Sequence, residues 1–269
     1  EISLGLVGSE MCIRDRLYNC GECYYCRTGH ANLCERAQKK PVREGLLIGP
    51  GGLCDYVIVN TGYLLKIPNT LSYEEASLTE PLACVVHSVT KANIQLGEDV
   101  VVIGGGIMGQ YHVMLTKRRG ARVIMSEVDE SRRALARKLG ADITFNPMEK
   151  DPVEYVKSLT EGRGADVVFN TTAIPSVVPQ AIAMTGKAGR MIQYSSMHPD
   201  APAPVSPQML HGNEPILTGS ISPDVHDFFT ANRLLSGGII DCKPLIAKKF
   251  PFEQAQQAFE AAIVPGTFR

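Results

Sequence analysis

Four cysteines lie close together near the start of the 269-residue chain, at Cys20, Cys23, Cys26 and Cys34. Their C-x2-C-x2-C-x7-C spacing on a short, glycine-containing loop lets four thiolates surround one Zn²⁺ tetrahedrally. Such a site leaves no coordination position open, so we predict a structural zinc rather than a catalytic one. An iron–sulfur cluster also takes four thiolates, but the long last gap and the absence of a following proline fit it less well. Metal-free cysteines are the other alternative, and His30, inside the loop, is expected to face solvent.

A glycine-rich turn follows an apolar run in the middle of the chain. Val100–Ile103 leads into three glycines with the spacing G-x-G-x-x-G, and a helix-compatible stretch follows. This order is typical of a dinucleotide-binding βαβ unit, in which the first glycine permits a tight turn and the second lets backbone approach a pyrophosphate. The third glycine lets the helix pack on the strand, and the free N–H groups of the helix face the anion. The expected cofactor-binding residues of this turn are Gly104, Gly106, Ile107, Met108 and Gly109.

An acidic residue follows the second apolar run of this unit. Glu127 lies 18 residues beyond Gly109, near the ~20 expected for an acid that binds the ribose hydroxyls of the cofactor. Its charge would repel a 2′-phosphate, so the sequence favours NAD over NADP. Arg132 and Arg133 follow closely and weaken that preference. Arg132 is a candidate for stacking on adenine or contacting the ribose, and a solvated arginine on a helix face is the alternative.

Strand and helix patterns alternate around this unit and predict a complete Rossmann domain. Such alternation implies a parallel sheet covered by helices on both faces. The expected strands are 100–103, 122–126, 143–145, 166–170, 190–194 and 216–219. The expected helices are 107–119, 131–139, 152–160, 177–184 and 225–236. Upstream, an apolar helix begins at Glu80, with Leu82, Val85, Val86 and Val89 at helical spacing.

Bulk composition excludes several classes of partner. The chain is 44% hydrophobic and 20% charged with a net charge of −1, which is ordinary for a globular protein. This charge offers no electrostatic footprint for nucleic acid or an anionic membrane. No apolar run reaches the ~18 residues of a membrane span, and no basic region precedes the N-terminal apolar residues. A cysteine cluster in such a chain indicates metal binding before disulfides, and we infer a cytoplasmic protein.

The first sixteen residues, EISLGLVGSEMCIRDR, do not fit the rest of the chain. They resemble a peptide that recurs when sequencing or cloning adapter is translated together with a coding fragment. We therefore expect residues 1–16 to be non-native, the native sequence to begin near Leu17, and Cys12 not to be a ligand. A genuine N-terminal strand and loop is the alternative.

The cysteine array followed by the glycine turn resembles the zinc-containing medium-chain alcohol and polyol dehydrogenases, in their sorbitol- and threonine-dehydrogenase-like branch. Further similar segments are Gly51-Gly52-Leu53-Cys54-Asp55-Tyr56-Val57, Leu64 to Pro68, Ser72-Tyr73-Glu74-Glu75-Ala76 and Glu80-Pro81-Leu82. The likeness extends from about Cys20 to Arg269. It implies an α/β fold: a Rossmann dinucleotide-binding domain plus an incomplete GroES-like, β-rich catalytic domain with a structural-zinc loop. The expected boundaries are 91–243 for the Rossmann domain and 17–90 with 244–269 for the partial catalytic domain. A strand near Pro244–Ile246 and a helix at 253–262 would return the chain to the catalytic domain.

The resemblance also implies the chemistry. In the family, an alcohol binds a catalytic Zn²⁺, which lowers the hydroxyl pKa so that the alkoxide passes hydride to the nicotinamide. That zinc is held by a cysteine and a Gly-His-Glu motif upstream of the structural cysteines, and neither motif occurs here once residues 1–16 are excluded. We therefore expect both ends of the chain to be cut and the chain as it stands to have little or no activity. Glu80 would lie beside the catalytic zinc, or would only favour the helix dipole; Cys84 and His87 match no ligand position.

Further family features concern the nicotinamide half and the partners. Asn170-Thr171-Thr172-Ala173 is similar to the family's strand-end Ala-Thr-Gly, which would place Thr172 near the nicotinamide; capping the next helix is the alternative. The expected partners are a small-molecule alcohol or polyol substrate and further copies of the chain in a homodimer or homotetramer, with no nucleic acid and no membrane. Two competing interpretations are a zinc-free quinone-reductase-like member, a branch that usually lacks the cysteine lobe, and a non-catalytic NAD-binding fragment.

Overall fold

The structure, a computed structural model, describes residues 12–14, 19–37 and 64–264. The chain divides into two compact units. Unit 1 comprises Glu1–His87 and Ile221–Lys243, and unit 2 comprises Ser88–Ser220 and Pro244–Arg269. The first boundary falls inside helix α3 (Thr79–Ala92). The family-like segment Gly51–Val57 and most of residues 1–16 lie outside the described residues.

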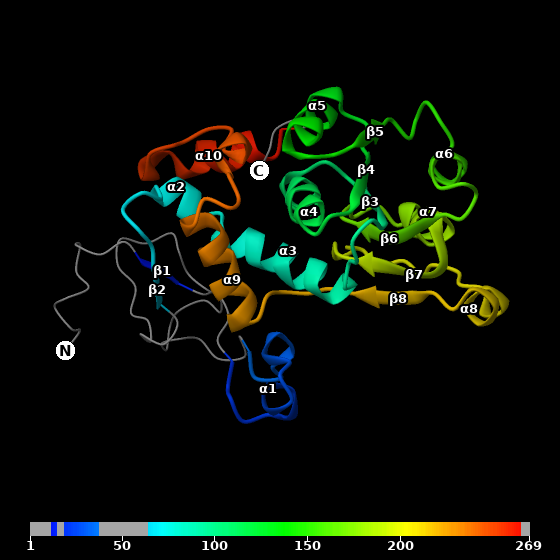
Figure 1. Ribbon diagram of the computed structural model, residues 1–269. Helices are drawn as coiled ribbons and strands as arrows, with labels where there is room; N and C mark the ends of the chain where they lie inside the picture. Colours follow the sequence, from blue (N-terminus) through cyan, green and yellow to red (C-terminus); the bar gives the residue numbers. More distant parts are fainter. Residues whose placement is uncertain (1–11, 15–18, 38–63, 265–269) are drawn as a thin grey trace. The chain divides into compact units, whose positions relative to one another are not determined.

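Unit 2 is built on a six-stranded parallel sheet in the order β5-β4-β3-β6-β7-β8. The strands are β3 (Asp99–Ile103), β4 (Arg122–Ser126), β5 (Ile143–Phe145), β6 (Ala165–Asn170), β7 (Thr185–Gln193) and β8 (Ile216–Gly219). The helices between them are α4 (Ile107–Arg118), α5 (Glu130–Leu139), α6 (Pro152–Leu159), α7 (Val177–Met184) and α8 (Pro207–Asn213). Helices α4 and α5 cover one face and α6 and α7 the other (Figure 1). The expected Rossmann sheet is confirmed.

The sheet is held by apolar residues that become buried on both of its faces. All five residues of β3 are buried, as expected for a central parallel strand that reads as a continuous apolar run. Between the sheet and α6 and α7, Val101, Val168 and Met184 belong to one buried cluster. Complete burial of a side chain of this size stabilises the fold by roughly 1.5–3 kcal/mol. The apolar runs of the sequence therefore become the strand cores.

Side-chain caps set several helix ends. Asp129 accepts a hydrogen bond from the Arg132 N–H at the start of α5, and Asp151 does the same for Glu154 at the start of α6. Gly140 ends α5 with a φ of 116°, a left-handed conformation that glycine adopts without strain. Capping explains why the helices begin and end within a residue of the expected limits.

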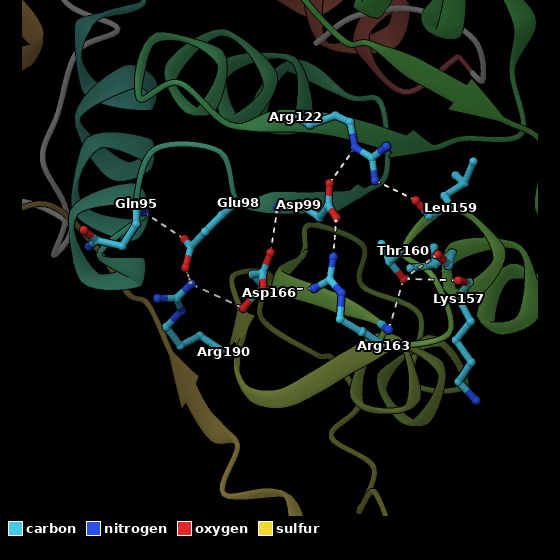
Figure 2. Close-up of polar contacts among 12 residues, drawn as sticks. Gln95, Glu98, Asp99, Arg122, Lys157, Leu159, Thr160, Arg163, Asp166 and Arg190 are labelled. Atoms are coloured by element: carbon cyan, nitrogen blue, oxygen red, sulfur yellow. Dashed lines mark hydrogen bonds and ion pairs between the residues drawn. The ribbon is translucent and has the colours of Figure 1, made fainter.

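A network of ion pairs joins the amino ends of four strands (Figure 2). Asp99 of β3, whose side chain is 8% exposed, accepts from Arg122 of β4 at 2.5 Å and from Arg163 at 3.4 Å. Arg190 of β7 donates to Glu98 at 2.5 Å. These bonds tie β3 to β4 and, across β6, the start of β3 to β7, at the end of the sheet opposite the glycine turn, which follows the carboxyl end of β3.

Unit 1 contains a short antiparallel pair and the cysteine loop. Strand β1 (Cys12–Arg14) pairs with β2 (Leu64–Lys66), so part of the segment expected to be non-native forms a strand; the origin of that segment stays a prediction. The helices are α1 (Tyr24–Arg27), α2 (Tyr73–Ala76), most of α3 and α9 (Val225–Ser236). The expected apolar stripe of α3 is confirmed, because Leu82, Val85, Val86 and Val89 are all buried.

Two local expectations differ from the structure. The strand expected near Pro244–Ile246 is wrong: Lys243–Leu245 forms a 3₁₀ turn, because Asp241 accepts from the Lys243 N–H and proline has no N–H to donate to a strand ladder. Helix α8 was not expected; Ser206 caps it and Pro207 begins it.

The compact units also group the C-terminal segments differently from the expected domains. Ile221–Lys243 belongs to unit 1, and Pro244 onward belongs to unit 2. In that last part, helix α10 (Ala255–Ala262) begins two residues later than expected, after a 3₁₀ turn at Phe252–Gln254. Among the described residues, no helix is long and apolar enough to cross a membrane.

Candidate metal and cofactor sites

The four cysteines converge in unit 1. The Sγ atoms of Cys20, Cys23, Cys26 and Cys34 all lie within 4.8 Å of one another. The Cys20–Cys26 and Cys23–Cys34 sulfur pairs are each 4.0 Å apart, and the four thiols are free of disulfides. Sulfurs around a tetrahedral zinc with bonds of about 2.3 Å lie roughly 3.8 Å apart. The sulfur spacing and the donor set therefore fit one zinc ion.

Backbone groups of the loop prepare the thiols for a cation. The N–H of Cys23 lies 3.3 Å from Cys20 Sγ, and the N–H of Cys20 lies 3.4 Å from Cys34 Sγ. The backbone N–H of Cys26 lowers the pKa of Cys23 to about 6, whereas desolvation and then the neighbouring thiol of Cys23 raise the pKa of Cys26 to about 12. Thiols so close cannot all ionise unless a cation lies among them. His30 is exposed, as expected.

In the glycine turn of unit 2, the surrounding protein leaves no room for a side chain at two of the three glycines of the motif. Gly104 has a φ of +98°, and a Cβ added there would lie 2.8 Å from Thr171 Oγ1. A Cβ on Gly109 would lie 1.8 Å from the carbonyl oxygen of Gly104. Real Cβ atoms essentially never come closer than 3.0 Å to such atoms. Folding alone therefore requires glycine at both positions.

Gly106 is different. It has a φ of −65°, and apart from the adjoining backbone no atom of the described residues lies within 4 Å of a Cβ added there. Gly106 also precedes α4 as its cap residue, so that this open space adjoins the first free N–H groups of the helix. The protein itself does not require glycine here, whereas a ligand that contacts the backbone would. The turn therefore fits a pyrophosphate.

Glu127 lies at the end of β4 beside the same turn. Its carboxylate accepts from the Gly105 N–H at 2.5 Å and from the Asp129 N–H at 2.8 Å, and the residue is 6% exposed. Arg133 donates to the backbone carbonyls of Glu127 and Val128 and pairs with Glu130. Arg133 therefore holds the backbone of the β4–α5 connection and donates none of these bonds to the Glu127 carboxylate.

Arg132 and Thr172 also lie next to the turn. The Arg132 Cβ is 3.2 Å from a Cβ added at Gly105, and Arg132 is half-buried rather than fully solvated. Thr172 donates through its N–H and hydroxyl to Asn170 Oδ1, at 3.1 and 2.8 Å. The capping alternative for Thr172 is wrong, because α7 begins after Ser176.

Three residues of this site were missed in the sequence. Gly105 is required because a Cβ there would lie 2.8 Å from Glu127 Cγ. Gln110, fully buried in α4, donates to the carbonyls of Gly105 and Arg132, at 3.0 Å each. Asn170 donates to Gln193 on the neighbouring strand at 2.9 Å. For Gly105 the sequence held a signal, because it stands between two other glycines in the run Gly104–Gly106. The roles of Gln110 and Asn170 depend on tertiary contacts.

Glu80 lies in the first turn of α3, in unit 1. The Cys84 Sγ lies 3.6 Å from Glu80 Oε1, and His87 Nδ1 lies 2.7 Å from Asp227 Oδ2. All three α3 residues are half-buried, and their spacing places them along one helix face. The structure therefore adds an imidazole–carboxylate pair that the sequence did not indicate.

Two family models match the chain. One, described as a zinc-binding dehydrogenase, matches residues 108–237, and the other, described as an alcohol dehydrogenase GroES-like domain, matches residues 5–69. The second match includes part of the segment expected to be non-native.

Individual relatives agree with these models. D-arabitol-phosphate dehydrogenase of Enterococcus avium is 32% identical over 258 residues, which are 94% of this chain and 71% of that protein. L-threonine 3-dehydrogenase of Caldanaerobacter subterraneus is 33% identical over 91% of this chain and 69% of its own length. Among solved structures, a zinc-binding dehydrogenase of Sinorhizobium meliloti, bound to NADP, superposes with a TM-score of 0.87 at 28% identity and covers 97% of this chain and 75% of its own.

Proposed function

Because the chain belongs to the zinc-type medium-chain alcohol and polyol dehydrogenase family, we propose that it binds NAD at the glycine turn and zinc at the four cysteines. The reaction of this family member is hydride transfer between NAD and a secondary alcohol or polyol. The names of its relatives, a sugar-alcohol phosphate dehydrogenase and a threonine dehydrogenase, support a small hydroxylated substrate.

The cofactor proposal rests on one observation: the fold leaves no room for a side chain at two of the three glycines but leaves room at the other. Gly104 and Gly109 are required by the fold, whereas Gly106 borders open space at the start of α4. The free N–H groups of that helix would bind the pyrophosphate, and the positive end of the helix dipole adds to the attraction. Glu127 would accept hydrogen bonds from the ribose hydroxyls.

The residues of this chain would bind and orient the cofactor, the metal and the substrate, while the cofactor and the metal would supply the chemistry. When bound, nicotinamide accepts or donates hydride and a catalytic zinc polarises the alcohol oxygen. Thr172, held by Asn170, would border the nicotinamide half. Glu80 would lie beside the catalytic metal. The four-cysteine loop leaves no coordination position open and would have a structural role only.

We propose NAD rather than NADP as the cofactor. The Glu127 carboxylate is buried and accepts only from backbone N–H groups among the hydrogen bonds of the described residues. A 2′-phosphate beside it would meet a like charge, and the Arg133 bonds go to backbone carbonyls and Glu130 instead of this carboxylate. Two observations favour NADP instead: the similar Sinorhizobium meliloti structure is bound to NADP, and the half-buried Arg132 lies next to the turn. Fluorescence titration of the chain with NADH and NADPH tests this choice, and tighter binding of NADPH would refute it.

We propose that the 269-residue chain alone has little or no dehydrogenase turnover. The sequence contains no Gly-His-Glu motif, and Glu80 is the one residue that we assign to the neighbourhood of the catalytic zinc. Turnover of a polyol or threonine panel by the chain with added zinc and NAD would contradict this proposal. The alternative is a non-catalytic NAD-binding fragment. Such a fragment would bind NADH and retain structural zinc, but it would show no turnover even when joined to a segment that carries the cysteine and the Gly-His-Glu motif.

Zinc content separates this proposal from a zinc-free, quinone-reductase-like protein. We expect one chelator-resistant zinc per chain in the wild type and its loss in Cys34→Ser. Cys242→Ser is the matched control, because Cys242 is a buried cysteine outside the cluster, whose Sγ lies 3.9 Å from the Glu75 carbonyl oxygen. A wild-type chain without zinc, or equal zinc loss in the control, would contradict the site.

We propose a homodimer or homotetramer. In the described part of the chain, strand β8 pairs with β7 alone, and Ile216 on this edge strand is 56% exposed. An exposed apolar edge strand is a surface that further strands can extend. Sedimentation of the chain and of Ile216→Lys tests this: the variant should dissociate, and a monomeric wild type would refute the proposal.

A further inference from the structure

Asn32 links the cysteine loop to other parts of unit 1. It lies in the 3₁₀ turn Ala31–Leu33, two residues before Cys34. Its Nδ2 donates to the carbonyl oxygen of Ile221 at 2.9 Å. The same nitrogen lies 3.5 Å from Nε2 of His87, the longer of the two contacts. A side chain of the loop thus bonds segments that are 55 and 189 residues away in the sequence.

His87 of α3 is held from its other side by α9. Its Nδ1 lies 2.7 Å from Oδ2 of Asp227, which is 4% exposed. Burial opposes ionisation of Asp227, but the His87 bond and the Asp224 backbone N–H outweigh it and lower the pKa of this carboxyl. A carboxylate only accepts, so His87 Nδ1–H donates to Asp227, and Nε2 faces the Asn32 amide nitrogen, which is a donor, as its acceptor.

A second route from Asn32 reaches the same imidazole. Ile221 lies three residues before Asp224, the cap of α9. Asp224 and Asp227 form a reciprocal capping box, in which each side chain accepts from the other residue's N–H. Asn32 therefore bonds the segment that leads into α9, and α9 presents the carboxylate that bonds His87. Both routes lie within unit 1.

His87 shares its helix face with Glu80. The spacing of Glu80, Cys84 and His87 corresponds to successive turns of α3, and the first two are in contact at 3.6 Å. A rotation of α3 that moved His87 would move Glu80 in the same direction. The bonds of His87 therefore also constrain the residue that we assign to the catalytic metal.

We propose that Asn32 and His87 are positioning residues through which metal binding at the four cysteines fixes helix α3. The proposal rests on the zinc loop of the proposed function. With zinc bound, the four thiolates hold Cys34, and with it Asn32, in place. Without zinc no common ligand holds the four sulfurs together, the turn that carries Asn32 loses its anchor, and His87 Nε2 loses its donor. Coupling of this kind is reciprocal, so that loss of His87 must also weaken zinc retention.

Histidine side-chain NMR of the full chain tests the coupling directly. The His87 ring signals, assigned by their absence in His87→Asn, should shift when zinc is removed from the wild type. In Asn32→Ala the zinc-dependent shift should be lost. The matched control is Thr28→Ala, because the Thr28 hydroxyl bonds only the Tyr24 and Tyr25 carbonyls of its own loop among the described residues; it should keep the shift. An unchanged shift in Asn32→Ala would overturn the proposal.

Competition with a chromophoric chelator measures the reciprocal effect. Zinc dissociation constants should rise about fivefold in His87→Asn, which loses the Asn32–His87 bond, and by at least as much in Asn32→Ala, which also loses the bond to Ile221, with Thr28→Ala within about twofold of the wild type. If Asn32→Ala fails to fold, His87→Asn reports the coupling from the other end. Zinc retention that is unchanged in His87→Asn overturns the coupling alone, whereas a wild type that binds no zinc overturns the zinc loop as well.

Discussion

Replacing Gly106 with alanine should weaken cofactor binding while the fold stays intact. Its φ of −65° and ψ of −179° are allowed for alanine, and apart from the adjoining backbone the added Cβ would meet none of the described atoms within 4 Å. Alanine at a compatible glycine position reduces the freedom of the unfolded chain, which stabilises the fold by about 0.4–1 kcal/mol. The unfolding free energy should therefore be unchanged or slightly higher.

The same methyl group would stand where the cofactor's pyrophosphate must approach. A hydrogen bond from a backbone N–H to a charged acceptor contributes about 1.5–3 kcal/mol. Loss of one such bond weakens affinity by about 10- to 150-fold. We therefore expect the NADH dissociation constant of Gly106→Ala to rise by at least about tenfold.

Gly109→Ala is the matched comparison, since the same methyl group is added three residues along the turn. Here the Cβ would lie 1.8 Å from the Gly104 oxygen, so the turn or α4 must move by more than an ångström. Overpacking of this kind costs about 1–3 kcal/mol or more. Urea unfolding should show the loss in Gly109→Ala alone.

The assays are NADH fluorescence titration and urea unfolding of the two variants and the wild type. The reasoning is refuted if Gly106→Ala binds NADH as tightly as the wild type, because the open space beside it would then not receive the cofactor. It is refuted equally if Gly106→Ala unfolds as readily as Gly109→Ala.

Three further predictions concern charge. Glu127→Gln should raise the affinity for NADPH relative to NADH by about tenfold, since a like-charge repulsion of about 1.4 kcal/mol is removed; an unchanged ratio in titrations would show that this carboxylate does not select the cofactor. Complete burial lowers the pKa of His112 to about 4 from an ordinary 6.5, although its bond to Met108 opposes the shift. The folded state thus binds fewer protons, and stability should be full above about pH 6.5 and fall by about 3 kcal/mol as the pH drops to 4; His112→Gln should remove this part of the slope in urea unfolding at several pH values, and an equal slope would contradict it. Asp99→Asn should lower the unfolding free energy by about 1–3 kcal/mol, because the buried carboxylate bonds two arginines, whereas the exposed pair partner Glu154→Ala should change it by less than about 0.5 kcal/mol. Equal effects of the last two would show that burial does not decide the strength of these pairs.

Some features of this protein follow from local sequence. The apolar run of β3 is buried at every residue, and the left-handed Gly104 stands where the spacing places the tight turn. Capping by Asp129 and Asp151 is likewise local, so helix limits could be predicted to within a residue or two. The clustering of the four thiols was predictable because the cysteines are close along the chain.

Other features were decided only when distant segments came together. Gly105 is required because Glu127, 22 residues away, occupies the space beside it. His87 looked like an unassigned helix residue until the fold brought Asp227 to it across 140 residues. Pro244 opens an apolar stretch that resembles a strand, yet the segment bends into a 3₁₀ turn. Periodicity and spacing report on neighbours along the chain, whereas the partner of a buried polar group depends on which surfaces the fold places in contact.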